Sequence, residues 1–188
     1  MLIAITGTPG TGKTKIAEEL SNMLDVKLIK INEFVTKQKL SVGYDKKRES
    51  KIVDVKKLKK KLLKFLNNTE YKTIIIEGHL AHFVPSDLTF VLRTEPNELK
   101  KRLKKRKYNK AKIRENIEAE ILDVIYAEAL ENARNKSAVI QIDTTNKKPQ
   151  QVAKKMLNML KIKKYHSDNV DWLAKCGDYL WKNSFPEH

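Results

Sequence analysis

The 188-residue sequence has a single cysteine, Cys176, so an intramolecular disulfide framework is excluded, and a reducing compartment is expected. No apolar run approaches the roughly 20 residues of a membrane-spanning helix, and the N-terminus has no signal-peptide pattern. Aromatic residues make up 7% and are scattered, too few for a base-stacking platform, and no zinc-ligand spacing occurs. These absences predict a cytoplasmic protein without membrane contact.

Acidic residues are also few relative to basic ones, and the formal net charge is +16. Of the 39 basic residues, 33 are lysines. One interpretation is a polyanionic partner such as RNA, because lysine-rich surfaces attract phosphate backbones. The other is a general lysine bias of the kind seen in hyperthermophile proteins, with the lysines on solvent-facing helix surfaces. The composition leaves both open.

Glycine is scarce, with six in the chain, yet Gly7, Gly10 and Gly12 fall within the stretch "GTPGTGKT". This stretch matches G-x-x-x-x-G-K-[ST], and a strand-like run precedes it. Such a loop points backbone N–H groups at a phosphate, and the helix that follows adds its partial positive charge. Lys13 is expected to reach the β- and γ-phosphates, and the Thr14 hydroxyl to bind Mg²⁺.

Apolar, β-branched runs alternate with amphipathic helical patterns along the chain, which predicts an α/β fold with a parallel sheet. Strands are expected at 2–6, 27–31, 73–77, 88–92 and 138–142. Helices are expected at about 13–24, 32–40, 55–67, 95–106, 111–134 and 149–161.

Three segments fall outside this alternation. Residues 41–54 are predicted to form a mobile loop beside a short helix, and residues 104–112 a charged break between two helices. The segment 165–188 has fewer lysines and contains both tryptophans of the chain. It is expected to form an amphipathic helix packed on the core, or alternatively a partner-binding face. Its expected buried residues are Val170, Leu173 and Leu180, with Trp172 and Trp181 nearby.

A second acidic group is expected near the metal ion, and Glu77 is the candidate because it ends the apolar run "TIIIE". Its contact with Mg²⁺ could be direct or through water. His79 lies two residues further on and could orient water, substrate or metal-bound water. His82 is expected to be a loop or core histidine.

A third set of residues lies in "LKKRLKKRKYNKAKIREN". Arg102 and Arg106 are four residues apart, on one face of a predicted helix. Their guanidinium groups could grip the base and phosphates of a nucleotide. The alternative is a solvent-exposed basic face, which suits the lysines better than Arg106, because arginine and lysine are not interchangeable.

Together these features resemble the P-loop nucleoside monophosphate kinases, and more closely the adenylate kinase isoenzyme 6 family of archaea and eukaryotes. The resemblance covers about residues 1–161. Beyond the P-loop it rests on "GYD" (43–45), "EGH" (77–79), "FVLRT" (90–94), "RL" (102–103), "RKY" (106–108) and "KIRENIEAEI" (112–121).

The resemblance implies a three-layer P-loop NTPase fold with a five-stranded parallel sheet in the order 2-3-1-4-5. It also implies a monophosphate-binding segment at about 30–53, a lid at about 104–114 and a C-terminal helical extension at 162–188. The residues implied for ATP are Gly10, Gly12, Lys13, Thr14, Lys15, Arg102, Arg106, Lys147 and Lys148. Those implied for AMP are Glu33, Lys37, Gly43, Tyr44, Asp45 and Arg93. Thr36 stands where an arginine might grip the AMP phosphate.

The implied reaction is transfer of the ATP γ-phosphate to AMP with Mg²⁺, catalysed by Lys13, Glu77, His79 and Arg106, with an associated ATPase activity. A monomer is expected. The resemblance also implies a role in small ribosomal subunit biogenesis, with a small-subunit ribosomal protein and ribosomal RNA as partners. An ATP-driven assembly factor and a P-loop kinase of another small acceptor stay as alternatives.

Overall fold

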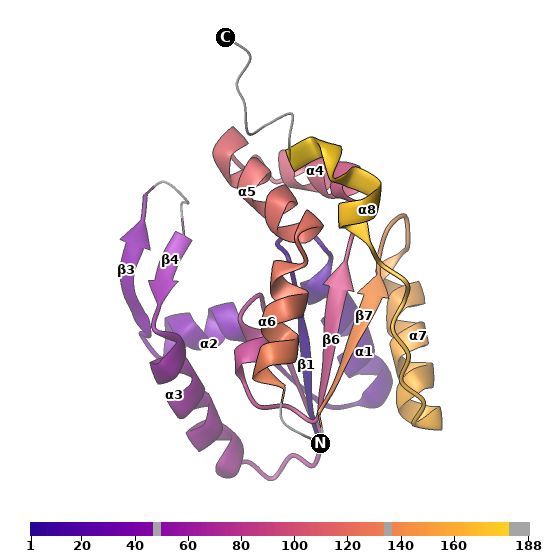
Figure 1. The fold of residues 1–188 in the computed structure, drawn as a ribbon. Helices are drawn as coiled ribbons and strands as arrows, with labels where there is room; N and C mark the ends of the chain where they lie inside the picture. Colours follow the sequence, from indigo (N-terminus) through magenta and orange to yellow (C-terminus); the bar gives the residue numbers. More distant parts are fainter. Residues whose placement is uncertain (47–49, 134–136, 181–188) are drawn as a thin grey trace.

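A central parallel sheet organises the protein, of which the computed structural model describes residues 1–46, 50–133 and 137–180. Its strands lie in the order β2-β5-β1-β6-β7 (Figure 1), which confirms the predicted order. Across the three described ranges, no helix is both long enough and apolar enough to cross a membrane. The strands are β1 (Leu2–Gly7), β2 (Lys27–Lys30), β5 (Ile74–Glu77), β6 (Leu88–Arg93) and β7 (Ala138–Asp143).

Helices cover both faces of this sheet. Successive residues of a strand point to opposite faces, so the apolar strands have side chains to bury on each face. On β1, Ile3 and Ile5 pack with α1 (Lys13–Leu24) and α7 (Pro149–Ile162). Ala4, between them, belongs to the core on the other face. That face is covered by α2 (Ile31–Lys37), α3 (Val55–Asn67), the short 3₁₀ helix η1 (Ala81–Phe83) and α6 (Val124–Asn132).

A third apolar cluster joins α4 (Pro96–Lys105), α5 (Lys110–Ile121) and the short C-terminal helix α8 (Trp172–Cys176). Trp172 is buried, but Leu173 is 51% exposed. Leu173 was therefore placed on the wrong face by the sequence pattern, while Trp181 lies outside the described residues. The buried members of this cluster are Leu99, Leu103, Ile113, Ile117, Ile121, Val170 and Trp172.

A β-hairpin replaces the loop expected at 41–54. Strands β3 (Ser41–Asp45) and β4 (Ser50–Val53) pair antiparallel beside α2 and α3 (Figure 1). The prediction of a mobile loop beside a helix was wrong because β3 packs neither face on a core: four of its five residues are exposed. Val42 and Tyr44 alternate with polar residues and glycine, but they are 60% and 59% exposed, so this short run has no buried apolar face and gives only a weak strand signal.

The helix expected at 111–134 is interrupted, and its last residue lies outside the described residues. α5 ends at Ile121, and α6 begins at Val124. Between them Asp123 adopts a left-handed conformation with φ 56°, and its carboxylate pairs with the buried Arg93. A long-range ion pair thus fixes the break, so local periodicity could not indicate it.

Candidate functional site

The glycine-rich loop joins β1 to α1 at the carboxyl edge of the sheet. Gly10 and Gly12 have φ values of 101° and 97°, a region that residues with a side chain rarely occupy. A Cβ at Gly10 would also lie 2.7 Å from the Leu99 side chain, on α4. Both glycines are therefore required by the backbone path, which aims the first turn of α1 at the cavity beside it.

Lys13 begins α1 and folds back over the loop. Its Nζ donates to the carbonyl oxygens of Gly7 at 2.8 Å and Thr8 at 3.0 Å. Burial lowers the pKa of this ammonium to about 8, against the opposing attraction of Glu77 and with a further lowering by the positive charge of Arg106. Burial therefore disfavours the charged form of Lys13, and nearby phosphate oxygens would stabilise that form.

Thr14 and Glu77 bring two oxygen ligands together. Glu77 ends β5 and is 4% exposed, and its Oε1 accepts a hydrogen bond from Thr14 Oγ1 at 3.2 Å. Burial raises the pKa of this carboxyl, and the nearby Lys13 opposes the rise. Within the described ranges there is no cluster of three or more His, Cys, Asp or Glu that could hold a metal ion alone. The pair fits Mg²⁺, which is typically bound by one or two protein oxygens plus phosphates and water.

The two histidines after β5 occupy different environments. His79 lines the cavity, and desolvation together with the charge of Lys13 lowers its pKa to about 4, so the imidazole is neutral. His82 is 3% exposed and has partners on both nitrogens: Nδ1 lies 2.9 Å from Thr6 Oγ1, and Nε2 lies 3.1 Å from Glu128 Oε2. Of the two environments expected for His82, loop or core, the burial agrees with the core.

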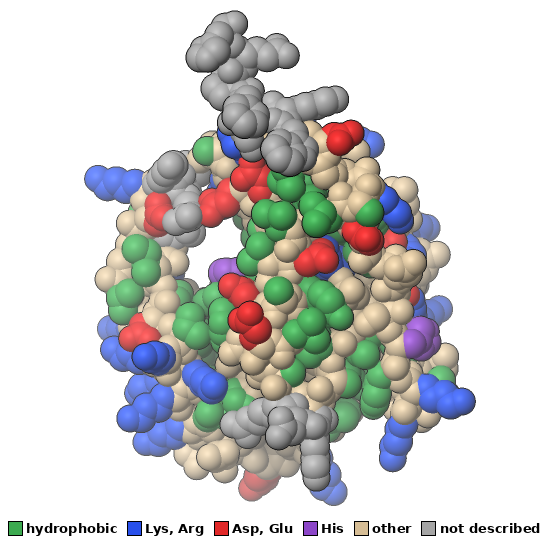
Figure 2. Space-filling model, in the orientation of Figure 1, with side chains coloured by type: hydrophobic (Ala, Val, Ile, Leu, Met, Phe, Trp, Pro, Cys, Tyr) green, Lys and Arg blue, Asp and Glu red, His purple; other side chains and the backbone are tan. Residues whose placement is uncertain are grey.

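A cavity of about 770 Å³ opens between the P-loop, the β3–β4 hairpin and helices α5 and α6, and Figure 2 shows the hollow beside the hairpin. The structure brings five predicted site residues to its walls, from the start of α1, the end of β5 and the segment after it, and the end of α4. They are Lys13, Thr14, Glu77, His79 and Arg106. All the residues predicted to be catalytic therefore face one space.

The other residues predicted for ATP do not line this cavity. Arg102 donates to the backbone oxygen of Thr144 at 3.1 Å, so α4 is tied to the loop after β7. The Thr144 hydroxyl in turn donates to the backbone oxygen of Thr11 at 3.0 Å, which places this loop against the P-loop. Lys147 and Lys148 follow in the same loop with exposed side chains.

None of the six residues predicted for AMP lines the cavity. Gly43, Tyr44 and Asp45 are on β3, and Glu33 and Lys37 are on exposed positions of α2. The cavity is lined instead by the opposite hairpin strand and by another face of α2. The segment at 30–53 therefore contributes to the cavity wall, but through side chains other than those predicted.

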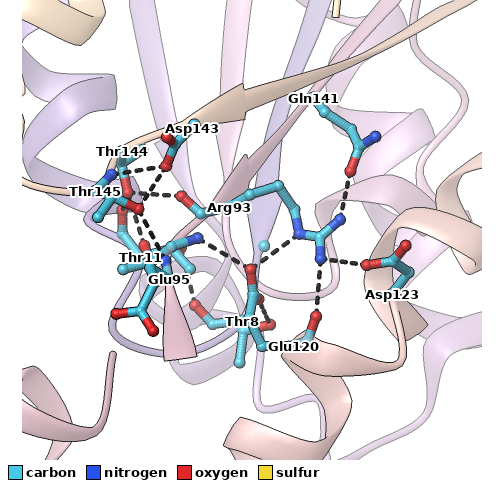
Figure 3. A network of polar contacts seen from close by, with 12 residues as sticks. Thr8, Thr11, Arg93, Glu95, Glu120, Asp123, Gln141, Asp143, Thr144 and Thr145 are labelled. Atoms are coloured by element: carbon cyan, nitrogen blue, oxygen red, sulfur yellow. Dashed lines mark hydrogen bonds and ion pairs between the residues drawn. The ribbon is translucent and has the colours of Figure 1, made fainter. Parts of the chain in front are cut away.

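Arg93 has a different place from the predicted one. It is 2% exposed at the end of β6, within the polar network of Figure 3. Its Nε donates to Glu120 Oε1 at 2.9 Å, and its other nitrogens bond Gln141 and Asp123. The Glu120 carboxylate also accepts from the hydroxyl of Thr8, in the P-loop. Arg93 therefore holds α5 against the sheet and the loop, and the predicted AMP contact is corrected.

Several residues that line the cavity were not among the predicted site residues. Lys51 lines the hairpin side, and Lys112 and Glu128 line the side of α5 and α6. Thr36 and Tyr108 also line it; the sequence marks Thr36 only as standing in place of an arginine, and Tyr108 only as part of "RKY". Lys112 lies within the "KIRENIEAEI" stretch, which was a usable signal. Lys51 had none, since its strand was not predicted.

Archaeal proteins are similar to this chain over most of its length. A protein of Methanocaldococcus jannaschii named "Putative adenylate kinase" is 42% identical over 182 residues, which cover 96% of this chain and 97% of that protein. A Pyrococcus furiosus protein of the same name is 40% identical over 85% of this chain and 84% of its own length. The chain belongs to this family. A family model described as an AAA domain also matches residues 3–123.

Solved structures of more distant proteins share the fold. Shikimate kinase from Acinetobacter baumannii in complex with shikimate superposes with a TM-score of 0.59 at 15% identity, over 87% of this chain and 94% of that chain. Deoxyadenosine kinase from M. mycoides with bound dATP gives 0.56 at 18% identity, over 86% and 99%. This chain therefore shares its fold with these two kinases.

Proposed function

We propose that this protein is an ATP-dependent nucleoside monophosphate kinase that transfers the γ-phosphate of ATP to AMP and yields two ADP. The observation that carries the proposal is the single cavity of about 770 Å³, which extends from the P-loop to α2 and the β3–β4 hairpin. A donor phosphate on the loop and an acceptor against the hairpin would share this space. The family supports a nucleotide substrate through relatives named for adenylate kinase activity.

In this mechanism the protein positions the phosphates and balances their charge, without a covalent intermediate. Lys13 would neutralise the β- and γ-phosphates, and Arg106 would face the transferring phosphoryl group from the segment after α4. Thr14 and Glu77 would hold Mg²⁺, which when bound supplies charge neutralisation and orients the phosphates. His79, being neutral, would orient an acceptor or a water molecule.

The surrounding segments would complete the two nucleotide sites. Residues 104–114 would act as a lid, and residues 30–53 as the acceptor segment, on a kinase domain spanning 1–161. Gly10, Gly12, Lys15 and Arg102 would contact ATP, with the loop of Lys147 and Lys148 beside the base. Closure would exclude water and limit ATP hydrolysis. A monomer would be the active form.

ATP binding is expected to weaken as the pH rises through about 8. Lys13 has its pKa lowered to about 8 in the free protein, and a bound triphosphate would raise that pKa again. Above pH 8, binding must therefore recharge Lys13, whereas near pH 6 the group is charged in both states. Calorimetry at pH 7 and pH 9, in two buffers of different ionisation enthalpy, measures affinity and proton uptake. Equal affinity at both pH values, without proton uptake at pH 9, would contradict this role.

The acceptor is tested by coupled assays of ADP formation with ATP and AMP, CMP, UMP, dAMP or no acceptor. We expect AMP to give the fastest turnover and the reaction without acceptor to give a slower basal hydrolysis, the proposed associated ATPase activity. The kinase proposal fails if no monophosphate raises ADP formation above that basal rate. Activation by another small acceptor alone would instead indicate the alternative P-loop kinase.

A second candidate function, in assembly of the small ribosomal subunit, has support from the charge on α3. Six of the thirteen residues of this helix are lysines, and basic side chains gather over it in Figure 2. Such a surface suits a ribosomal RNA or a protein bound to it. A pull-down of small-subunit protein and RNA at increasing salt tests it. Binding that vanishes at modest ionic strength would indicate lysine electrostatics alone.

A further inference from the structure

The wall of the cavity opposite the P-loop carries a lysine from the hairpin. Lys51 lies on β4, and its Nζ donates to Thr36 Oγ1, on α2, at 3.0 Å. Lys51 and Thr36 both line the cavity that Lys13 enters from the other side. This hydrogen bond holds the ammonium group between β4 and α2, which form neighbouring parts of the cavity wall.

Strand geometry explains why Lys51 points into the cavity. Lys51 pairs with Tyr44, and Ile52 pairs with Gly43, in the antiparallel register of the hairpin. Side chains of a strand alternate between two faces, so Lys51 and Val53 share one face and Ile52 points to the other. Lys51 and Val53 both line the cavity, whereas Ile52 does not.

The charges around the cavity make Lys51 distinctive. Lys13 and Arg106 line the P-loop side, and Lys112 lies on α5 with its Nζ 4.2 Å from the centre of the Tyr108 ring. On the side formed by α2 and the described part of the hairpin, the cavity-lining residues are Ile31, Asn32, Val35, Thr36, Lys51 and Val53. Lys51 is the only cation in that set.

We propose that Lys51, oriented by Thr36, binds the phosphate of the acceptor nucleotide. The inference rests on the proposed kinase function and adds the residue that recognises the acceptor's anionic group. An ammonium group has three N–H donors; one is used on Thr36, and the other two suit phosphate oxygens. A cation here would hold the acceptor phosphate on the hairpin side of the cavity, across from the donor phosphates on the P-loop. That placement suits in-line transfer, in which the attacking and leaving oxygens lie on opposite sides of the transferred phosphorus.

The test is a steady-state comparison of wild type with Lys51→Met, Lys51→Arg and Thr36→Val. Loss of a charge-assisted hydrogen bond to phosphate predicts a KM for AMP about 10- to 100-fold higher in Lys51→Met. The KM for ATP should stay within about twofold of wild type because Lys51 lies away from the P-loop. Lys51→Arg should recover part of the loss, and Thr36→Val should raise the KM for AMP by a smaller factor.

A matched control and a binding measurement make the outcome specific. Lys56→Met removes an exposed lysine at the start of α3, outside the cavity, and should leave both KM values unchanged. Calorimetry with AMP and with adenosine should show that Lys51→Met removes the preference for AMP and leaves adenosine binding intact. An unchanged KM and affinity for AMP in Lys51→Met would overturn the inference while the kinase proposal stands. No AMP-dependent ADP formation by wild type would instead overturn the kinase proposal.

Discussion

Replacing Arg93 with methionine is expected to lower the free energy of unfolding by about 3–5 kcal/mol, because a buried carboxylate then loses its counter-charge. The Arg93 and Glu120 side chains are 2% and 1% exposed, and Nε lies 2.9 Å from Oε1. Water cannot replace the guanidinium at this depth, so Glu120 must be neutralised or must move. Chemical denaturation followed by circular dichroism measures the change.

The control for this prediction is another arginine–glutamate pair, which lies entirely on α5, the helix that carries Glu120. Arg114 and Glu118 are four residues apart on α5, with side chains 50% and 30% exposed. Arg114→Met should change stability by at most about 0.5 kcal/mol, because exposed pairs of this kind contribute little. In the double variant Arg93→Met/Glu120→Met, part of the loss should be recovered, since no lone charge stays buried. If Arg93→Met cost no more than Arg114→Met, the stabilising role of the network would be wrong.

Replacing Lys13 with methionine is expected to lower the rate of phosphoryl transfer by about 10²- to 10³-fold, the effect of removing one donor aimed at developing charge. Methionine keeps the length and apolar stem of the side chain but removes the ammonium group that bonds the oxygens of Gly7 and Thr8. Basal ATP hydrolysis should fall in parallel, because both reactions would use the same donor phosphates. Single-turnover kinetics with saturating ATP and AMP measures the transfer step.

Lys60→Met, on the exposed surface of α3, controls for the loss of one positive charge from a strongly basic protein. It should keep wild-type turnover. An unchanged unfolding midpoint in Lys13→Met would show that its lost activity is not a folding defect. Retention of more than about a tenth of wild-type activity by Lys13→Met would exclude the role in the transfer step.

The parts of the fold that could be predicted from sequence are those with a local signal. The β1 run, the glycine loop and α1 follow one another as an apolar strand, a turn that needs positive φ, and an amphipathic helix. The β3–β4 hairpin could not be predicted, because its strands pair mainly with each other and expose most of β3. The break at Asp123 depends on Arg93, thirty positions away, which no local pattern contains.

The same distinction applies to the site. Lys13, Thr14, Glu77 and His79 were predictable because they end or follow strands at the carboxyl edge of one parallel sheet, where such ends converge. Arg93 also ends a strand there, but its side chain points inward to Glu120, and sequence position alone does not give that direction. Lys51 escaped prediction because its orientation depends on the hairpin register.

The proposed transfer to a monophosphate can be followed by the fate of the phosphoryl group itself. ATP radiolabelled at the γ-phosphate is incubated with the protein, Mg²⁺ and unlabelled AMP, and the products are separated by thin-layer chromatography. We predict that the label appears in ADP at a rate that rises with AMP concentration and falls in both Lys13→Met and Lys51→Met. Label found only in inorganic phosphate, at the same rate with and without AMP, would contradict the kinase and identify the protein as an ATPase.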